Sequence, residues 1–276
     1  VTNVYHVHDN PIFGSFNNFG KITPKILSLW RKIMNQFPGS KLFLKDGGRY
    51  GGEYRKDIMR ERLHNASFND EEFAIEGSTY DYFDRYQDVD IILDTYPYVG
   101  GGTTCDALYS GVPVITMYGR RHSTRFGYSL LHNVGIGELA CATEEEYVEK
   151  AVALASDKEL LAALHAKLPE MMRNSPVMDA RGYVRDMEAL YEKIWSKWLQ
   201  KAVDIDPENE VPKEYDAPFE TPMQSTPKIP KELKKLLPSL KKIQMLSLLK
   251  GNLFGKKVLL IGGQKETYLA ENKEIK

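Results

Sequence analysis

Residues 89–118 read VDIILDTYPYVGGGTTCDALYSGVPVITMY, and this stretch predicts the class of the fold. An apolar run that ends near Tyr96 is followed by three consecutive glycines, a short segment of helical pattern and a second apolar run at 113–118. Strands that alternate with helices are typical of a parallel sheet covered by helices. We therefore expect an α/β fold in which the glycines connect a strand to a helix.

The same alternation extends over the first 200 residues. Each apolar run is followed by a segment with helical periodicity, which predicts a Rossmann-like parallel sheet flanked by helices, with a helical C-terminal extension. After the fifth run we expect no further strand within these 200 residues. The predicted strands are 11–16, 41–44, 73–77, 89–96 and 113–118, and the later helices are 123–133, 144–156, 158–173 and 181–199.

Several of the predicted helices begin with capping signals. Thr23 is placed to cap a helix whose first residue is Pro24, because its side-chain oxygen can accept from the first backbone N–H groups. Apolar residues then recur with helical spacing as far as Phe37, so we expect that face in the core. Two later helices open with capping boxes, Thr143 with Glu146 and Ser156 with Glu159.

The predicted helix 181–199 carries a broad aromatic stripe. A stripe of this kind belongs to a protein core more often than to a ligand site, so we predict that it is buried. Its members are Tyr183, Met187, Leu190, Tyr191, Ile194, Trp195 and Trp198.

Residues 1–200 form one predicted domain, and the composition changes after it. Residues 201–230 are rich in proline and acidic residues, as in a linker. Residues 231–250 place leucines on one side and lysines on the other; packing of this face against protein is favoured over contact with a membrane surface. The last residues, to 276, have the pattern of a strand followed by two glycines and are the possible start of a further α/β unit.

Composition excludes several function classes. The 276 residues carry a net charge of -1, so no basic field exists for binding nucleic acid. Only two cysteines occur, which predicts neither a disulfide framework nor a zinc site and favours a cytoplasmic location. No apolar run approaches the roughly 20 residues that span a bilayer. Because the sequence begins with valine, we expect it to be part of a longer polypeptide.

The glycine loop is a candidate phosphate site. Glycines let the backbone approach a ligand closely, and the first N–H groups of the following helix favour an anion. Thr103 and Thr104 add hydroxyl donors, and the Asp106 carboxylate can accept hydrogen bonds from the two hydroxyls of a ribose. The alternatives are a turn that binds nothing and an acid that only complements the helix dipole.

A second loop follows the first predicted strand, in the stretch FGSFNNFGKITPK. It offers the polar pair Asn17 and Asn18, and Lys21 is placed to neutralise a phosphate as a point charge. The alternative for Lys21 is a solvated surface lysine.

Two further patterns were weighed as candidate sites. The pair Asp88 and Asp90 matches a D-x-D metal motif, but Asp90 leads into an apolar strand, so we interpret it as structural and expect no metal. For the arginine-rich run 120–125, phosphate binding and simple surface exposure stay equally open.

These motifs together resemble the C-terminal catalytic lobe of the O-linked N-acetylglucosaminyltransferases, over about residues 11–199. The resemblance rests on FGSFNNFGKITP, on residues 88–119, on TRFGYSLLHNVGI and on SPVMDARGYVRDMEALYEKIW. It implies one lobe of a two-lobed, GT-B type glycosyltransferase that binds a UDP-sugar without an obligatory metal or other cofactor, with the bacterial members as the nearer match.

The resemblance also assigns roles to individual residues. It implies that Lys21 contacts the phosphates as the catalytic residue of this lobe and that Asp106 binds the ribose. The substrate-binding residues implied by the motifs, or by the loop chemistry above, are Asn18, Gly77, Thr79, Tyr82, Arg85, Gly101, Gly102, Thr103, Thr104 and Asp106. Four of them depart from the animal enzymes. Gly101 and Tyr82 stand where those enzymes have histidines, Gly102 where they have a threonine and Asn18 where they have a glutamine.

The resulting hypothesis is inverting transfer of a sugar, with N-acetylglucosamine favoured, to an acceptor hydroxyl such as that of a protein serine or threonine. The acceptor site and the general base are expected in an N-terminal lobe, so this chain alone is predicted to be incomplete. The alternatives are a nucleotide-sugar-binding or partner-binding module without transfer activity and a purely structural interaction domain.

Overall fold

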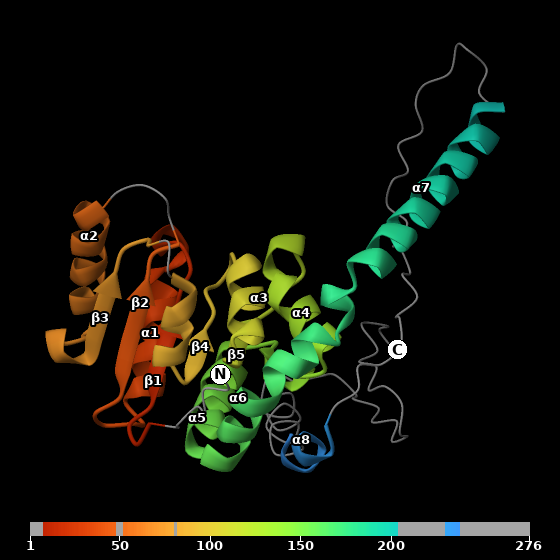
Figure 1. The fold of residues 1–276 in the computed structure, drawn as a ribbon. Coiled ribbons are helices and arrows are strands. Elements are labelled where there is room, and N and C mark those ends of the chain that lie inside the picture. Colours follow the sequence, from red (N-terminus) through yellow and green to blue (C-terminus); the bar gives the residue numbers. More distant parts are fainter. Residues whose placement is uncertain (1–7, 48–51, 80–81, 204–229, 238–276) are drawn as a thin grey trace, which may run out of the picture.

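The computed structural model describes residues 8–47, 52–79, 82–203 and 230–237 of the chain. In this part six parallel strands form one sheet in the order β3-β2-β1-β4-β5-β6 (Figure 1). Their bounds are β1 Ile12–Ser15, β2 Lys41–Lys45, β3 Phe73–Glu76, β4 Ile91–Leu93, β5 Val114–Met117 and β6 Ala140–Cys141. The predicted α/β class is confirmed, but the two-residue β6 shows that the expectation of no strand after residue 118 was wrong.

Helices connect and cover these strands. Because β1 to β3 run outward in one direction and β4 to β6 in the other, right-handed crossovers place the two sets of connecting helices on opposite faces. The helix α1 packs beside α5, and α3 packs beside α4 and α6. The helices are α1 Pro24–Met34, α2 Gly52–Asn65, α3 Gly102–Tyr109, α4 Phe126–Val134, α5 Glu144–Ser156, α6 Lys158–Arg173, α7 Ala180–Val203 and α8 Lys231–Leu236.

Short 3-10 helices complete the connections. One of them, η3 at Tyr82–Asp88, links β3 to β4 where helical periodicity had predicted an ordinary helix. The others are η1 Phe19–Lys21, η2 Asp70–Glu72, η4 His122–Thr124, η5 Gly137–Leu139 and η6 Pro176–Met178.

The start of α1 confirms the predicted cap. The Thr23 hydroxyl oxygen accepts from the Ile26 N–H at 3.2 Å, and Pro24 is the first helical residue. Trp30 on the buried face donates to the Tyr147 hydroxyl of α5 at 3.0 Å. Tyr147 in turn donates to the Asp94 carbonyl at 2.9 Å, so two helices are fixed to the end of β4.

The two predicted capping boxes have different outcomes. At the start of α5, Thr143 accepts from the Glu146 N–H, which confirms Thr143 as the cap. The Glu146 carboxylate accepts from the N–H of Ala142, one residue before the cap. At the second start Asp157 is the cap and accepts from the Leu160 N–H at 2.9 Å. Ser156 was therefore wrong as the cap: it belongs to the last turn of α5, where its hydroxyl donates to the Val152 carbonyl.

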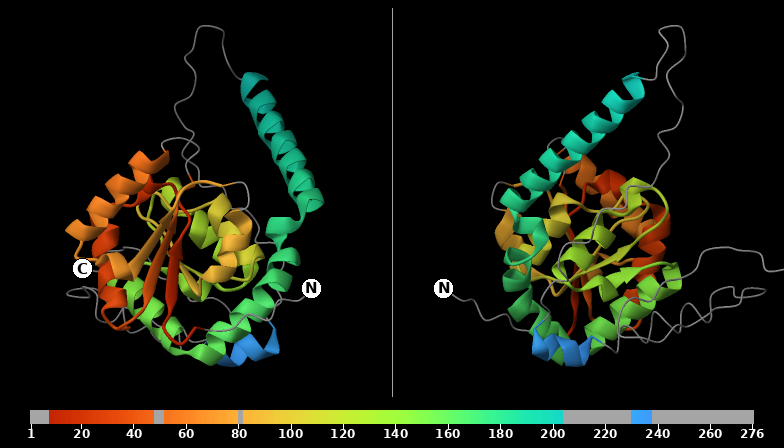
Figure 2. Two further views of the ribbon diagram at one scale, coloured as in Figure 1. Left: turned by 60° about the vertical axis from the view of Figure 1, so that its left-hand side comes forward. Right: turned by 90° about the vertical axis from the view of Figure 1, so that its right-hand side faces the viewer.

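The prediction for the aromatic stripe of α7 was also wrong. Figures 1 and 2 show α7 rising away from the sheet and its covering helices, so within the described residues the stripe lies in solvent. Trp195 and Trp198 stack on one another with ring centroids 5.0 Å apart. Periodicity identifies an amphipathic helix, but it does not say what covers its apolar face. The exposed members include Tyr183, Tyr191, Ile194, Trp195 and Trp198.

The start of the lysine-rich segment packs against the sheet domain. Leu233 and Leu237 of the α8 region are buried, and α8 lies against α6. This favours the protein-packing interpretation for residues 231–237. The rest of that amphipathic pattern, the strand pattern at the end of the chain and most of the linker, at 204–229, lie outside the described residues.

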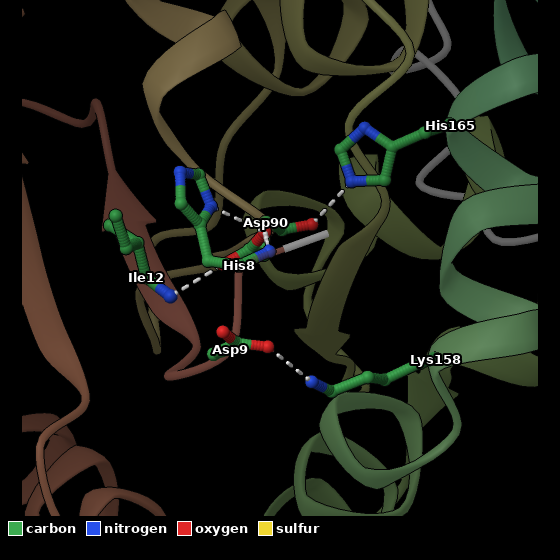
Figure 3. Close-up of polar contacts among 6 residues, drawn as sticks. All are labelled: His8, Asp9, Ile12, Asp90, Lys158 and His165. Atoms are coloured by element: carbon green, nitrogen blue, oxygen red, sulfur yellow. Dashed lines mark hydrogen bonds and ion pairs between the residues drawn. The ribbon is translucent and has the colours of Figure 1, made fainter. Parts of the chain in front are cut away.

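At the amino end of the sheet, the buried His165 of α6 contacts Asp90 (Figure 3). Its Nε2 donates to the Asp90 carbonyl at 2.8 Å, while the Asp90 carboxylate accepts from the Ile12 N–H at 2.6 Å and contacts His8. Burial lowers the pKa of His165 from 6.5 to about 4, against the opposing effect of the hydrogen bond to Asp90. Burial likewise raises the pKa of Asp90 to about 6.

His165 predicts a loss of stability in acid. Its pKa is lower in the folded than in the unfolded chain, so the folded state binds fewer protons and loses stability as the pH falls from 6.5 towards about 4. Between about pH 7 and about pH 5 the loss is about 2 kcal/mol of unfolding free energy. The raised pKa of Asp90 acts in the opposite direction, so the comparison must isolate His165.

Urea denaturation of the wild type and His165→Gln at both pH values provides that comparison. The variant keeps an N–H donor but does not titrate, so its unfolding free energy should fall less than that of the wild type. An equal loss of unfolding free energy in both proteins would show that His165 does not control the stability between about pH 7 and about pH 5.

Candidate functional site

The candidate site lies where the strand order reverses. Strands β1 and β4 are neighbours, yet their crossovers lead away in opposite directions, and ligands of open α/β sheets bind at the carboxyl ends of such a pair. The loop after β1 contains Asn17, Asn18 and Lys21, and the loop after β4 contains the three glycines. The structure therefore brings together the two loops that the sequence identified separately.

The glycine loop ends in an open helix N-terminus. Gly101 precedes α3 and provides no side-chain cap, and added Cβ atoms at Gly101 and Gly102 would meet no atom within 4 Å. Since the first N–H groups of a helix have no partner within the helix, this end is suited to an anion. Thr103 lies in the first turn, whereas the Thr104 side chain is buried beneath the loop.

Gly100 has a different function from its two neighbours. A Cβ on Gly100 would lie 2.7 Å from the Thr104 hydroxyl, 2.8 Å from the Thr103 hydroxyl and 3.1 Å from the Asp94 carboxylate. Its N–H donates to Asp94 Oδ1 at 2.7 Å. Gly100 is thus required for packing of the loop, while the next two glycines leave space in front of α3.

Lys21 faces this space from the other loop. Its Nζ donates to Asn17 Oδ1 and to the Val99 carbonyl, both at 3.2 Å, and lies 4.2 Å from the centre of the Tyr98 ring. Burial lowers the pKa of Lys21, while the nearby Asp94 carboxylate acts in the opposite direction. These direct contacts are all neutral groups, so the ammonium keeps its charge available to an anion.

The structure adds Asp94, which the sequence analysis did not select. Its Oδ1 accepts from the N–H groups of Thr95 and Gly100 and from the Asn17 amide, and its Oδ2 accepts from the Thr116 hydroxyl. Burial raises the pKa of this carboxyl, and these hydrogen bonds oppose the shift. The signal available in the sequence was an acid directly after an apolar strand and before a glycine loop.

Asp106 and Tyr82 lie together at the edge of the site. The Tyr82 hydroxyl donates to Asp106 Oδ2 at 3.1 Å. Burial raises the pKa of the Asp106 carboxyl, and the bond from Tyr82 opposes that shift. Next to them, Tyr86 donates to the Thr103 carbonyl at 3.1 Å and so ties η3 to the start of α3.

Other predicted site residues have partners of their own. Asn18 caps η1 by accepting from the Gly20 N–H at 2.8 Å, and its Oδ1 also accepts from Arg55 at 2.7 Å. Arg85 is bound to Glu76 and to Asp88. At the ligand edge, the amide oxygen of Asn18 and the guanidinium of Arg85 are therefore already engaged.

Gly77 and Thr79 follow the end of β3. The Gly77 carbonyl accepts from Lys45 at 3.2 Å, and Lys45 also pairs with Glu76 at 3.1 Å. Thr79 is exposed. Lys45 is buried, and with Glu76 and Arg85 it forms a charged network that the sequence analysis missed.

Of the two other candidate patterns, the D-x-D pair and the arginine-rich run, the D-x-D pair contacts a predicted site residue among the described residues, through Asp88 and Arg85. The Asp90 side chain fixes the start of β1, as described above, and Asp88 pairs with Arg85 at 2.6 Å. Arg125 donates to the Gly119 carbonyl and lies 4.8 Å from the centre of the Tyr128 ring. In the described part of the chain no group of three potential metal ligands occurs, and no helix there is long and apolar enough to cross a membrane.

Comparisons with known proteins agree with this geometry. Residues 2–187 match the family described as glycosyl transferase family 41. A probable UDP-N-acetylglucosamine–peptide N-acetylglucosaminyltransferase SPINDLY of Hordeum vulgare is 39% identical over 188 residues, covering 67% of this chain and 20% of that protein. The UDP-N-acetylglucosamine–peptide N-acetylglucosaminyltransferase of Caenorhabditis elegans is 33% identical over 196 residues, covering 70% of this chain and 17% of that protein.

Among solved structures, a mutant of the Thermobaculum terrenum O-GlcNAc transferase is similar with a TM-score of 0.64 and 31% identity. That match covers 73% of this chain and 40% of the other. The chain spans about a fifth of the length of its first curated relatives, since the match to the Hordeum vulgare protein covers 20% of it. Because that plant relative is more identical than the bacterial enzyme, the matches give no support to a bacterial source.

The close packing around Gly100 predicts that this glycine of the loop does not tolerate a side chain. Gly100→Ala should lower the unfolding free energy by about 1–3 kcal/mol, because the added methyl group overpacks the threonine hydroxyls. Gly102→Ala is the matched control and should leave the unfolding free energy unchanged or raise it by up to about 1 kcal/mol, since its Cβ enters open space and alanine is favoured over glycine in a helix. Urea denaturation measures both, and equal effects would contradict the assigned packing.

Proposed function

The chain belongs to glycosyl transferase family 41, and from this membership we propose that its sheet domain binds the nucleotide-sugar donor of an inverting glycosyltransferase. The relatives' names favour UDP-N-acetylglucosamine as the donor and a peptide as the acceptor. The domain spans only part of the length of those relatives, so we assign the acceptor site and the general base to a part of the enzyme that this chain does not cover.

One observation carries the proposal: a half-buried ammonium faces an uncapped helix N-terminus across the switch point of the sheet. Lys21 is held by an amide oxygen, a carbonyl oxygen and an aromatic ring, and none of these neutralises its charge. The N–H groups at the start of α3 form the opposite side of the candidate phosphate site. A diphosphate placed between them meets charge and hydrogen-bond donors without displacing an internal carboxylate.

The proposed reaction is direct displacement. The acceptor hydroxyl oxygen forms a bond to the anomeric carbon while the bond from that carbon to the β-phosphate oxygen breaks, and UDP leaves with the electron pair. The hydroxyl proton passes to the general base. Lys21 and the α3 N-terminus stabilise the negative charge that grows on the leaving phosphate, which is the contribution of this domain to the rate.

The nucleoside is assigned to the neighbouring end of the site. Asp106 is proposed to bind the ribose hydroxyls, with Tyr82 holding one of its carboxylate oxygens. Tyr82, Arg85, Gly77 and Thr79 are proposed to frame the base. Asn18 is proposed to lie near the nucleotide, with Gly101, Gly102, Thr103 and Thr104 forming the loop around the diphosphate.

Further proposals concern the setting of the reaction. No metal or other cofactor is required in the scheme, because Lys21 and the helix N-terminus take the charge that a metal would otherwise neutralise. A protein serine or threonine is the proposed acceptor, and the cytoplasm is the proposed location. Equal affinity for UDP in EDTA and in magnesium would support the metal-independent scheme.

Calorimetric titration with UDP tests the binding site. Lys21→Ala and Asp106→Ala should each weaken UDP binding by about 1–3 kcal/mol, roughly 5- to 150-fold, as expected for hydrogen bonds to charged groups. Lys25→Ala is a matched control, because this lysine lies on α1 and pairs with Glu144 on the surface. Unchanged affinity in both site variants would show that UDP binds elsewhere.

A panel of nucleotides distinguishes the proposed donor from its alternatives. UDP should bind more tightly than GDP or ADP if the site reads uracil, and UDP-N-acetylglucosamine should bind at least as tightly as UDP. A preference for another diphosphate would retain the phosphate site and reject the proposed donor. Absence of binding to all of them at about millimolar concentration, roughly 4 kcal/mol of binding free energy, would contradict the proposed function of the domain.

A further inference from the structure

Asn17 has a fixed amide orientation. It lies in the loop that follows β1, two residues after the last residue of that strand. Its side chain is buried, and its Nδ2 is 3.1 Å from Asp94 Oδ1. That oxygen already accepts from the N–H groups of Thr95 and Gly100, so it is an acceptor and carries no proton for Asn17. The amide nitrogen must therefore face Asp94, and the amide oxygen must face the opposite side.

The amide oxygen faces the candidate phosphate site. It accepts from Lys21 Nζ at 3.2 Å and from the Thr103 hydroxyl at 3.3 Å. One side chain thus connects the lysine in the loop after β1, the first turn of α3 and the carboxylate that holds Gly100. The two halves of the site are joined through this amide.

We propose that Asn17 is a positioning residue, which fixes the Lys21 ammonium relative to the N-terminus of α3. In terms of function this proposal rests on the diphosphate site described above. An amide is suited to the task because its oxygen holds the ammonium by a dipole and leaves the net positive charge for the phosphate. A carboxylate at the same position would neutralise Lys21 and would also lie against Asp94.

The alternative is that Asn17 only satisfies a buried hydrogen bond of Asp94, which would make its role purely structural. A double-mutant cycle separates the two roles, because groups that act through one another have non-additive effects. The four proteins are the wild type, Asn17→Ala, Lys21→Ala and the double variant, and the measurement is UDP affinity by calorimetry.

The expected result is strong coupling. Asn17→Ala should weaken UDP binding by about 10-fold when Lys21 is present and by less than about 3-fold in the Lys21→Ala background. The same factor in both backgrounds would overturn the proposal. Asn133→Ala, which removes a single surface bond to the Ser129 carbonyl, controls for the loss of an asparagine and should leave affinity unchanged.

A second variant covers the case in which Asn17→Ala does not fold. Asn17→Asp keeps the volume of the side chain but places a carboxylate beside Lys21, so it should weaken UDP binding more than Asn17→Ala does. If Asn17→Ala does not fold, the expected result for Asn17→Asp is a loss of UDP affinity of more than about 10-fold. Wild-type affinity in Asn17→Asp would contradict the proposal.

A measurement without nucleotide separates failure of this inference from failure of the proposed function. Competitive labelling with acetic anhydride, quantified by mass spectrometry, reports how firmly the Lys21 amine is held, with the exposed Lys41 as internal reference. Release of Lys21 in Asn17→Ala should raise its labelling relative to Lys41 several-fold, whether or not UDP binds. An unchanged ratio would show that Asn17 does not hold Lys21, even if the wild type binds UDP.

Discussion

The Asp94 carboxylate at the end of β4 organises the candidate site, because it fixes both of the loops that form it. A buried carboxylate is stable only when hydrogen bonds replace the water that it loses. Here the donors come from the glycine loop, from the loop after β1 and from β5, through Gly100, Asn17 and Thr116. Satisfying one buried charge therefore holds the ends of three neighbouring strands in a fixed arrangement.

The same constraint explains small residues around Asp94. Gly100 must lack a side chain because its N–H approaches the carboxylate beside two threonine hydroxyls. A Cβ at Gly127 of α4 would lie 2.5 Å from the hydroxyl of Thr116, the group that donates to Asp94 Oδ2. Two glycines far apart in the sequence are thus tied to one carboxylate, one by direct approach and the other through a threonine.

A feature of this structure could be predicted from the sequence when the residues that form it are close together in the chain. Strand runs, the Thr23 cap and the glycine loop depend on neighbours within a few residues, and they were predicted. The bonds from Asn17 to Asp94 and from Lys45 to Glu76 depend on which strands lie side by side, which a single sequence does not state. The α7 stripe failed for a related reason, because helical periodicity does not specify a covering surface.

The two ends of the site differ in how many of their polar groups already have hydrogen-bond or ion-pair partners within the protein. At the proposed phosphate end, the contacts of Lys21 with the described residues are all with neutral groups and α3 begins without a side-chain cap, so an anion would add interactions without displacing an ion pair of Lys21. At the proposed nucleoside end, Asp106 is bonded to Tyr82 and Arg85 is paired with two carboxylates. A nucleoside must therefore use the remaining acceptor sites of Asp106 or exchange existing bonds for its own. Affinity is then expected to come mainly from the phosphates, and discrimination between bases from the cost of that exchange.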